Sequence, residues 1–206
     1  MKKMMKAIFT ALVATMLFAG SSFALDFDYT GHLPYHNSVL QYSFTANGTS
    51  PVTLFSSSWD EGNFDPMLGL WKSDGSLVQW QDDGGLNGST LSNGISYSHG
   101  GWDSYFTNIL TAGSYFVTLS TYYNAPVSNN LSGGFSYDSQ TPVQISQWVQ
   151  PANGMRGDYF EFHITGVESA HDDSGNNNNP VPEPSTMLLL GGGLAGLAFW
   201  RKKKNA

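Results

Sequence analysis

The chain of 206 residues has no cysteine, and it has few basic residues outside its two ends. The absence of cysteine excludes disulfide bonds, so a folded domain needs a hydrophobic core or a bound metal for its stability. Between residues 25 and 180 the only basic residues are Lys72 and Arg156, whereas this segment holds all but one of the sixteen acidic residues. So much negative charge repels polyanions, which excludes nucleic acid as a partner, and it can attract divalent cations instead.

Strong helix formers are also scarce between residues 25 and 180, where Gly, Ser, Thr, Asn and aromatic residues dominate. This composition is typical of strands and turns. Leu40, Tyr42 and Phe44 alternate with polar residues, and Asp74-Gly75 separates two apolar segments as a hairpin turn would. The pattern predicts an all-β fold, an antiparallel β-sandwich over residues 25–168. The expected strands are residues 39–46, 52–56, 67–71, 77–81, 105–110, 114–121, 134–138 and 159–165.

The N-terminus has the three parts of a secretory signal peptide. Lys2, Lys3 and Lys6 supply positive charge, residues 7–20 are apolar, and residues 22–24 (Ser-Phe-Ala) form a cleavage site. We therefore predict that signal peptidase removes residues 1–24 during export.

The C-terminus combines a polar tract, a proline motif and an apolar segment. Residues 169–180, which include four consecutive asparagines, predict a flexible linker. The motif Val181, Pro182, Glu183 and Pro184 follows. Residues 187–200 are then apolar and, as a helix, would be about 21 Å long, shorter than a hydrocarbon core of ~30 Å.

The residues at the end of this apolar segment favour a transmembrane anchor over a helix packed on the domain. Trp200 is of the residue type found at membrane interfaces, and the basic residues Arg201, Lys202, Lys203 and Lys204 can hold the chain end in the cytoplasm. Positive charge lies outside both apolar segments, so the domain between them is expected on the far side of the membrane.

Residues 181–204 resemble the PEP-CTERM sorting signal of Gram-negative bacteria, through the Val-Pro-Glu-Pro motif, the apolar segment and the basic end. The resemblance implies export, transient anchoring in the inner membrane and cleavage near the motif by an exosortase. It also implies delivery to the cell surface or the extracellular matrix. It concerns the destination of the protein and leaves its biochemical activity open.

An acidic group is the strongest candidate for a binding site. Asp65 precedes the first strand of the predicted hairpin, Asp82 and Asp83 follow the second, and Asp60 and Glu61 lie close before it. Both ends of a hairpin fall at one edge of a sheet, where gathered carboxylates can bind Ca²⁺. The alternative is that these aspartates are ordinary turn residues, and there is no EF-hand pattern.

Tryptophans provide a second candidate site. Trp59 and Trp102 lie in Gly-, Ser- and Asp-rich segments, where exposed rings could stack on sugars. Trp71 and Trp80 lie inside expected strands and are expected in the core.

Four segments between residues 38 and 122 resemble the bacterial pre-peptidase C-terminal family: residues 64–71, the Asp74-Gly75 turn, residues 81–84 and residues 110–117. The resemblance implies a sandwich of jelly-roll type that serves secreted proteins as a binding or accessory module. In that family the module is usually attached to an enzyme, whereas we expect no catalytic domain within these 206 residues.

No motif for a nucleophilic serine or cysteine is present, so we expect no enzyme. We expect a protein of the cell surface or of the exopolysaccharide (biofilm) matrix. One alternative is a calcium-stabilised adhesion or accessory module that binds protein. The other is a small secreted glycan hydrolase, which would need two carboxylates ~5–9.5 Å apart.

Overall fold

The computed structural model describes residues 24–174. The predictions for residues 1–23, for residues 175–180 of the linker and for the sorting signal, with its motif at 181–184 and its membrane segment at 187–200, lie outside this range. Within residues 24–174 no helix is long and apolar enough to cross a membrane.

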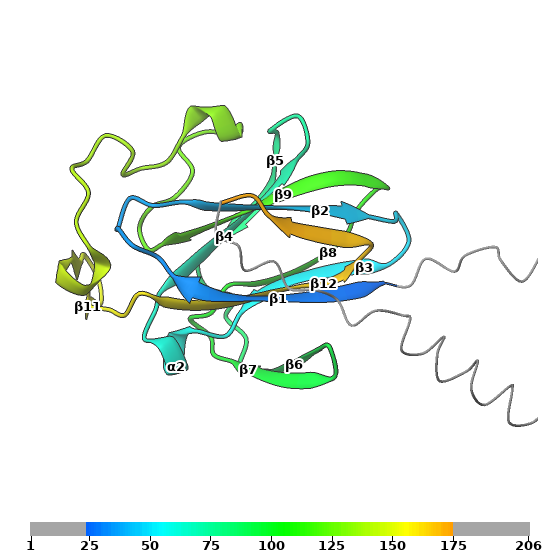
Figure 1. Cartoon of the computed structure of the whole chain (residues 1–206), viewed down its shortest axis with the longest axis horizontal. Coiled ribbons are helices and arrows are strands. Elements are labelled where there is room, and N and C mark those ends of the chain that lie inside the picture. Colours follow the sequence, from blue (N-terminus) through cyan, green and yellow to red (C-terminus); the bar gives the residue numbers. More distant parts are fainter. Residues whose placement is uncertain (1–23, 175–206) are drawn as a thin grey trace, which may run out of the picture.

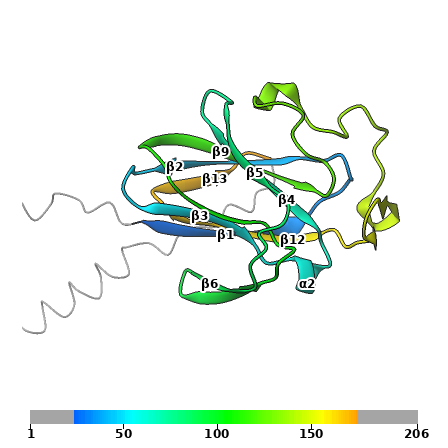
Figure 2. The same ribbon diagram turned by 180° about the vertical axis from the view of Figure 1, so that it is seen from behind.

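Two antiparallel sheets are stacked as layers (Figures 1 and 2). The four-stranded sheet contains, in spatial order, β1 (Leu25–His32), β12 (Tyr159–Val167), β3 (Pro51–Ser56) and β8 (Tyr105–Ile109). The five-stranded sheet contains β13 (Ser169–Asp172), β2 (Leu40–Ala46), β9 (Gly113–Thr121), β4 (Pro66–Lys72) and β5 (Leu77–Gln81). The predicted all-β antiparallel sandwich is therefore confirmed.

Shorter elements lie outside the two sheets. They are the hairpin of β6 (Gly88–Ser92) and β7 (Ile95–His99), the pair β10 (Val149–Gln150) and β11 (Gly154–Met155), the helix α2 (Trp59–Gly62), and the 3-10 helices η1 (Leu131–Gly133) and η2 (Ile145–Gln147). Figure 1 shows the β6–β7 hairpin beside the outer side of the four-stranded sheet.

The strand pairs are nested around one hairpin. β4 pairs with β5, β3 with β8, β2 with β9, and β1 with β12, all antiparallel. Each pair encloses the previous one along the chain, and successive strands from β1 to β4 alternate between the two sheets. This connectivity is a jelly roll, with β13 added at one edge of the five-stranded sheet.

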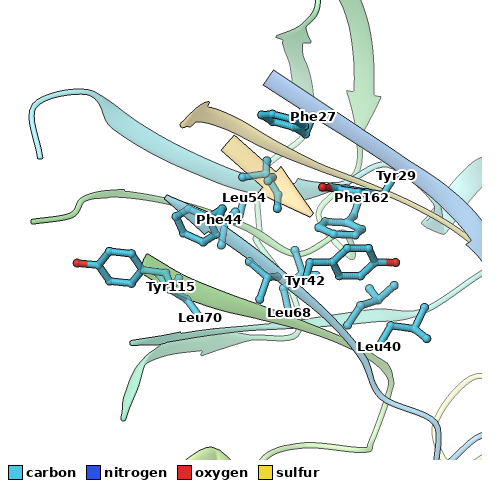
Figure 3. Packing of buried hydrophobic residues seen from close by; sticks show 14 of the residues in the cluster. Phe27, Tyr29, Leu40, Tyr42, Phe44, Leu54, Leu68, Leu70, Tyr115 and Phe162 are labelled. Carbon is cyan, nitrogen blue, oxygen red and sulfur yellow. The ribbon is translucent and has the colours of Figure 1, made fainter. Parts of the chain in front are cut away.

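Aromatic and aliphatic side chains from both sheets fill the space between them (Figure 3). The ring of Tyr42 lies 4.6 Å from the rings of both Tyr29 and Phe162, which join β2 to β1 and β12. In β2 the buried residues alternate with partly exposed ones, as the sequence pattern predicts. Burial of these rings is the main source of stability in a domain without disulfides.

Strand β4 is buried on both of its faces, and residues of the long loop after β9 pack against its outer face. Trp71 is fully buried there, contacts the ring of Phe135 in this loop and donates its indole N–H to Thr118 Oγ1 at 3.0 Å. Trp71 is therefore buried as expected, but beneath this loop and outside the cluster that fills the space between the sheets.

Three expectations about strands and core are wrong. Residues 134–138 form turns instead of a strand, because Asp138 Oδ2 accepts the N–H of Phe135 at 2.8 Å and closes a tight turn. Trp80 is 43% exposed, because it lies on the edge strand β5. The start of the predicted linker, Ser169–Asp172, is strand β13, which pairs with β2, so the domain continues past residue 168.

Candidate functional site

Three connections between strands form a cleft at the open end of the β4–β5 hairpin. Helix α2, in the connection from β3 to β4, supplies one wall and contains Trp59 and Asp60. Residues 100–102, in the connection from β7 to β8, supply the facing wall. Residues 83–87, after β5, complete the cleft, whose volume is about 420 Å³.

Asp103 joins the two walls. Its side chain is 1% exposed, and its Oδ1 atom accepts hydrogen bonds from Ser56 Oγ (2.9 Å) and from the N–H groups of Ser58 (3.1 Å) and Trp59 (3.2 Å). Its Oδ2 atom accepts the N–H of Gly100 at 2.9 Å. Burial raises the pKa of Asp103, although these hydrogen bonds act in the opposite direction. One carboxylate therefore fixes the start of α2 against the opposite wall.

The two tryptophans predicted as a carbohydrate contact lie together in this cleft. The rings of Trp59 and Trp102 pack with their centres 5.6 Å apart and 31° between their planes. The guanidinium carbon of Arg156 lies 3.6 Å from the centre of the Trp59 ring, a cation–π contact. Trp59 is thereby held in place by two neighbours, whereas Trp102 is 56% exposed and presents its ring to solvent.

Three of the five acidic residues in the predicted acidic group lie close together beside the cleft. Asp65 precedes β4, and Asp82 and Asp83 follow β5, so the antiparallel pairing of these strands brings them to one edge. One carboxylate oxygen from each residue lies within 4.8 Å of the other two. We call Asp65, Asp82 and Asp83 the acid cluster. Asp60 is not a member, because α2 directs it to the cleft, where Asp83 also lies.

Burial and mutual repulsion shift the protonation of the acid cluster. Burial raises the pKa of Asp82 to about 7, and the charges of Asp83 and Asp65 add to the shift. Burial raises the pKa of Asp65 to about 6, against the hydrogen bonds that it accepts from Asn153 (2.8 Å) and Gln150. The pKa of Asp83 is also raised by burial. Burial and the closeness of the three carboxyl groups therefore both act against simultaneous ionisation of the acid cluster.

Two buried oxygen atoms beside the acid cluster lack hydrogen-bond donors. They are Oδ1 of Asp82 and Oε1 of Gln150. The Gln150 residue is 1% exposed, and its amide NH₂ group donates both to the Asp65 carboxylate and, at 3.3 Å, to the carbonyl of Tyr122. A buried acceptor without a donor costs free energy, so these atoms have unused capacity to bind a ligand.

A serine, a histidine and an aspartate form a series that the sequence did not indicate. Ser57 Oγ lies 2.9 Å from His163 Nε2 and 2.9 Å from Glu161 Oε2, and His163 Nδ1 lies 2.6 Å from Asp28 Oδ1. A catalytic serine donates its proton to the histidine. In this arrangement Ser57 Oγ donates to Glu161 Oε2, and which atom donates in its contact with His163 Nε2 depends on the tautomer of the histidine. Both Ser57 and His163 are buried, and we assign the series to the packing of β1, β12 and the end of β3.

The residues that sequence reasoning missed are Asp103, Gln150 and Arg156. Each acts through partners that are distant in sequence: Asp103 bonds Ser56, 47 residues away, and Arg156 contacts the carbonyl of Trp59, 97 residues away. No local motif marks any of them, and only the scarcity of basic residues singles out Arg156.

The C-terminus matches a known family model. Residues 180–204 match the PEP-CTERM protein-sorting motif. This motif implies an exported protein that an exosortase processes and that is sorted to the surface in Gram-negative bacteria. A comparison with curated proteins found no match. The family match does not reach the sandwich, so the resemblance of residues 38–122 to the pre-peptidase C-terminal family stays a prediction.

Proposed function

We propose that this exported protein is a non-enzymatic component of the cell surface or the exopolysaccharide matrix, and that its sandwich domain binds glycans in the cleft beside Trp102. The observation that carries this proposal is the exposed Trp102 ring, which packs on Trp59, whose own ring contacts Arg156. Such a ring offers an apolar face to the C–H groups of a pyranose.

The polar groups of the cleft suit the same ligand. Asp60, Asp83 and Asn87 line the cleft and can hydrogen-bond sugar hydroxyls, while Gly100 and Gly101 leave the space beside the ring open. Many weak sites of this kind along a surface-bound polymer would give strong attachment through multivalency.

Binding to the exopolysaccharide of the producing organism tests the proposal. The protein is purified after export and titrated with the polymer. We expect Trp102→Ala to weaken binding at least about tenfold, the effect of losing ~1.4 kcal/mol of contact free energy. The matched control is Trp80→Ala, which removes a ring that is 43% exposed and does not line the cleft.

Two outcomes would count against the proposal. Equal binding by the Trp102→Ala variant and the unmodified protein would reject the cleft as the glycan site. Release of new reducing ends from the polymer would reject a non-enzymatic role and support the hydrolase alternative.

A further inference from the structure

Gly100 leaves an unfilled position in the wall of the cleft, and oxygen atoms surround this position. Beyond the adjacent residues, the atoms nearest to a Cβ placed on Gly100 would be Oδ2 of Asp60 (3.6 Å), Oδ2 of Asp103 (3.8 Å) and Oδ1 of Asn87 (4.0 Å). A Cβ on Gly101 would lie 3.6 Å from the same Asn87 oxygen. Helix α2, the segment after β5 and the connection from β7 to β8 therefore direct hydrogen-bond acceptors to one point of the cleft.

Negative charge in the cleft has no basic partner within it. Asp60 is exposed and lines the cleft together with Asp83, and no residue that lines the cleft is basic among those that the structure describes. Arg156 attracts Asp60 electrostatically, but its guanidinium packs on Trp59 and forms no ion pair with a carboxylate in the described part of the chain. The cleft therefore offers a ligand acceptors and negative charge.

One short turn carries both this acceptor position and the exposed tryptophan ring. The N–H of Asp103 donates to the carbonyl of Gly100 at 3.2 Å, with Gly101 and Trp102 at the centre of the turn. Oδ2 of the buried Asp103 side chain accepts the N–H of Gly100 at 2.9 Å and fixes the turn a second time. The Trp102 backbone and the acceptor position are thus held in a constant relation to each other.

We infer that the cleft prefers glycans with free amino groups, and that the protonated amine binds Asp60 and Asn87 beside Gly100. The inference rests on the proposed function, because Trp102 holds the sugar ring. An ammonium group has three donors and a positive charge, which match the converging acceptors and the carboxylate. A hydroxyl group has one donor and no charge, an N-acetyl group is neutral and larger, and the carboxylate of a uronic acid would be repelled. The expected ligand is a hexosamine polymer from which acetyl groups have been removed.

Calorimetric titration of the exported protein tests this preference. The ligands are trimers of glucosamine, N-acetylglucosamine and galacturonic acid, at about pH 6, where sugar amines carry a proton, and in chelator, which excludes binding through a metal. We expect the glucosamine trimer to bind at least about fivefold more tightly than the acetylated trimer, because it gains a charge-assisted hydrogen bond. We expect the galacturonic acid trimer not to bind, and the preference for the amine to decrease as salt is added.

Two variants locate the preference in the cleft. Asp60→Asn removes the charge and should lower the affinity for the glucosamine trimer to that for the acetylated trimer. Gly100→Ala should have the same effect, because its methyl group occupies the place of the amine, at van der Waals distances of 3.6–4.0 Å that the fold can accept. The matched control is Glu61→Gln, which removes an exposed charge of the same helix outside the cleft and should leave the preference unchanged.

The outcomes separate this inference from the proposed function. Equal affinity for the glucosamine and acetylated trimers, with both lost in the Trp102→Ala variant, would reject the amine preference and keep the glycan site. A preference that persists in Asp60→Asn, or that falls equally in Glu61→Gln, would show general attraction to an acidic domain and would also reject it. Undiminished binding of both trimers by the Trp102→Ala variant would reject the glycan site itself.

Discussion

Replacing Asp103 by alanine should destabilise the domain by roughly 3–4 kcal/mol, because one buried carboxylate serves four donors. The variant leaves the hydroxyl of Ser56 and three backbone N–H groups without their acceptor. Each unsatisfied buried donor costs about 1–3 kcal/mol, but entry of water and relief of the desolvated charge offset part of the sum.

The conservative variant Asp103→Asn should cost less, about 1–2 kcal/mol. The oxygen of the new amide can keep the three bonds made by Oδ1, whereas its NH₂ group would face the N–H of Gly100 in place of Oδ2. We therefore expect the unmodified protein to be the most stable, the Asp103→Asn variant to be intermediate and the Asp103→Ala variant to be the least stable. The physical reason for the intermediate position is that two donors would face each other.

Urea unfolding of the exported protein, followed by tryptophan fluorescence and circular dichroism, measures the loss of unfolding free energy in the Asp103→Ala and Asp103→Asn variants. For a domain of about this size the alanine variant should melt roughly 10 °C lower. Asp138→Ala is the control, since Asp138 is exposed and accepts the N–H of Phe135, and it should cost less than about 1 kcal/mol. An Asp103→Ala variant as stable as the Asp138→Ala variant would refute the assignment of Asp103 as the link between the walls.

Other measurements test further parts of the structure. Trp71→Phe removes the hydrogen bond to Thr118 and leaves a space in the core, so denaturant unfolding should show a loss of about 1–3 kcal/mol. Trp102→Ala should change stability by less than about 1 kcal/mol, because the ring is 56% exposed, and a larger loss would mean that the ring is structural. In chelator, the raised pKa values of Asp65 (about 6) and Asp82 (about 7) mean that the folded state binds more protons than the unfolded state. The contribution of these two groups to the free energy of unfolding should therefore be largest below about pH 4 and should decrease as the pH rises to about 7. A melting temperature that increases between about pH 4 and about pH 7 would contradict this expectation.

The sequence predicted those parts of the fold that local patterns determine. Alternation in Leu40–Ala46 and the turn at Asp74-Gly75 identified β2 and the β4–β5 hairpin, and the hairpin placed Asp65 near Asp82 and Asp83. The alternation of apolar and polar residues could not show which face of a sheet is covered by a loop from elsewhere in the chain.

The errors arose where tertiary contacts override local pattern. Trp80 alternates as a core residue would, but β5 is an edge strand. Ser169–Asp172 is polar and contributes only Ala170 to the core, so nothing in its composition distinguished β13 from a linker. The roles of Asp103 and Gln150 depend on partners on other segments of the chain, which a single sequence cannot reveal.

The indole N–H resonances of the tryptophans report directly on the proposed contact between glycan and Trp102 in the cleft. In NMR spectra of labelled, exported protein, oligosaccharides from the producer's exopolysaccharide should shift the signals of Trp102 and Trp59, which pack together 5.6 Å apart. The signals of buried Trp71 and of Trp80 outside the cleft should stay in place. Shifts confined to Trp80, or no shift at saturating oligosaccharide, would contradict glycan binding at Trp102.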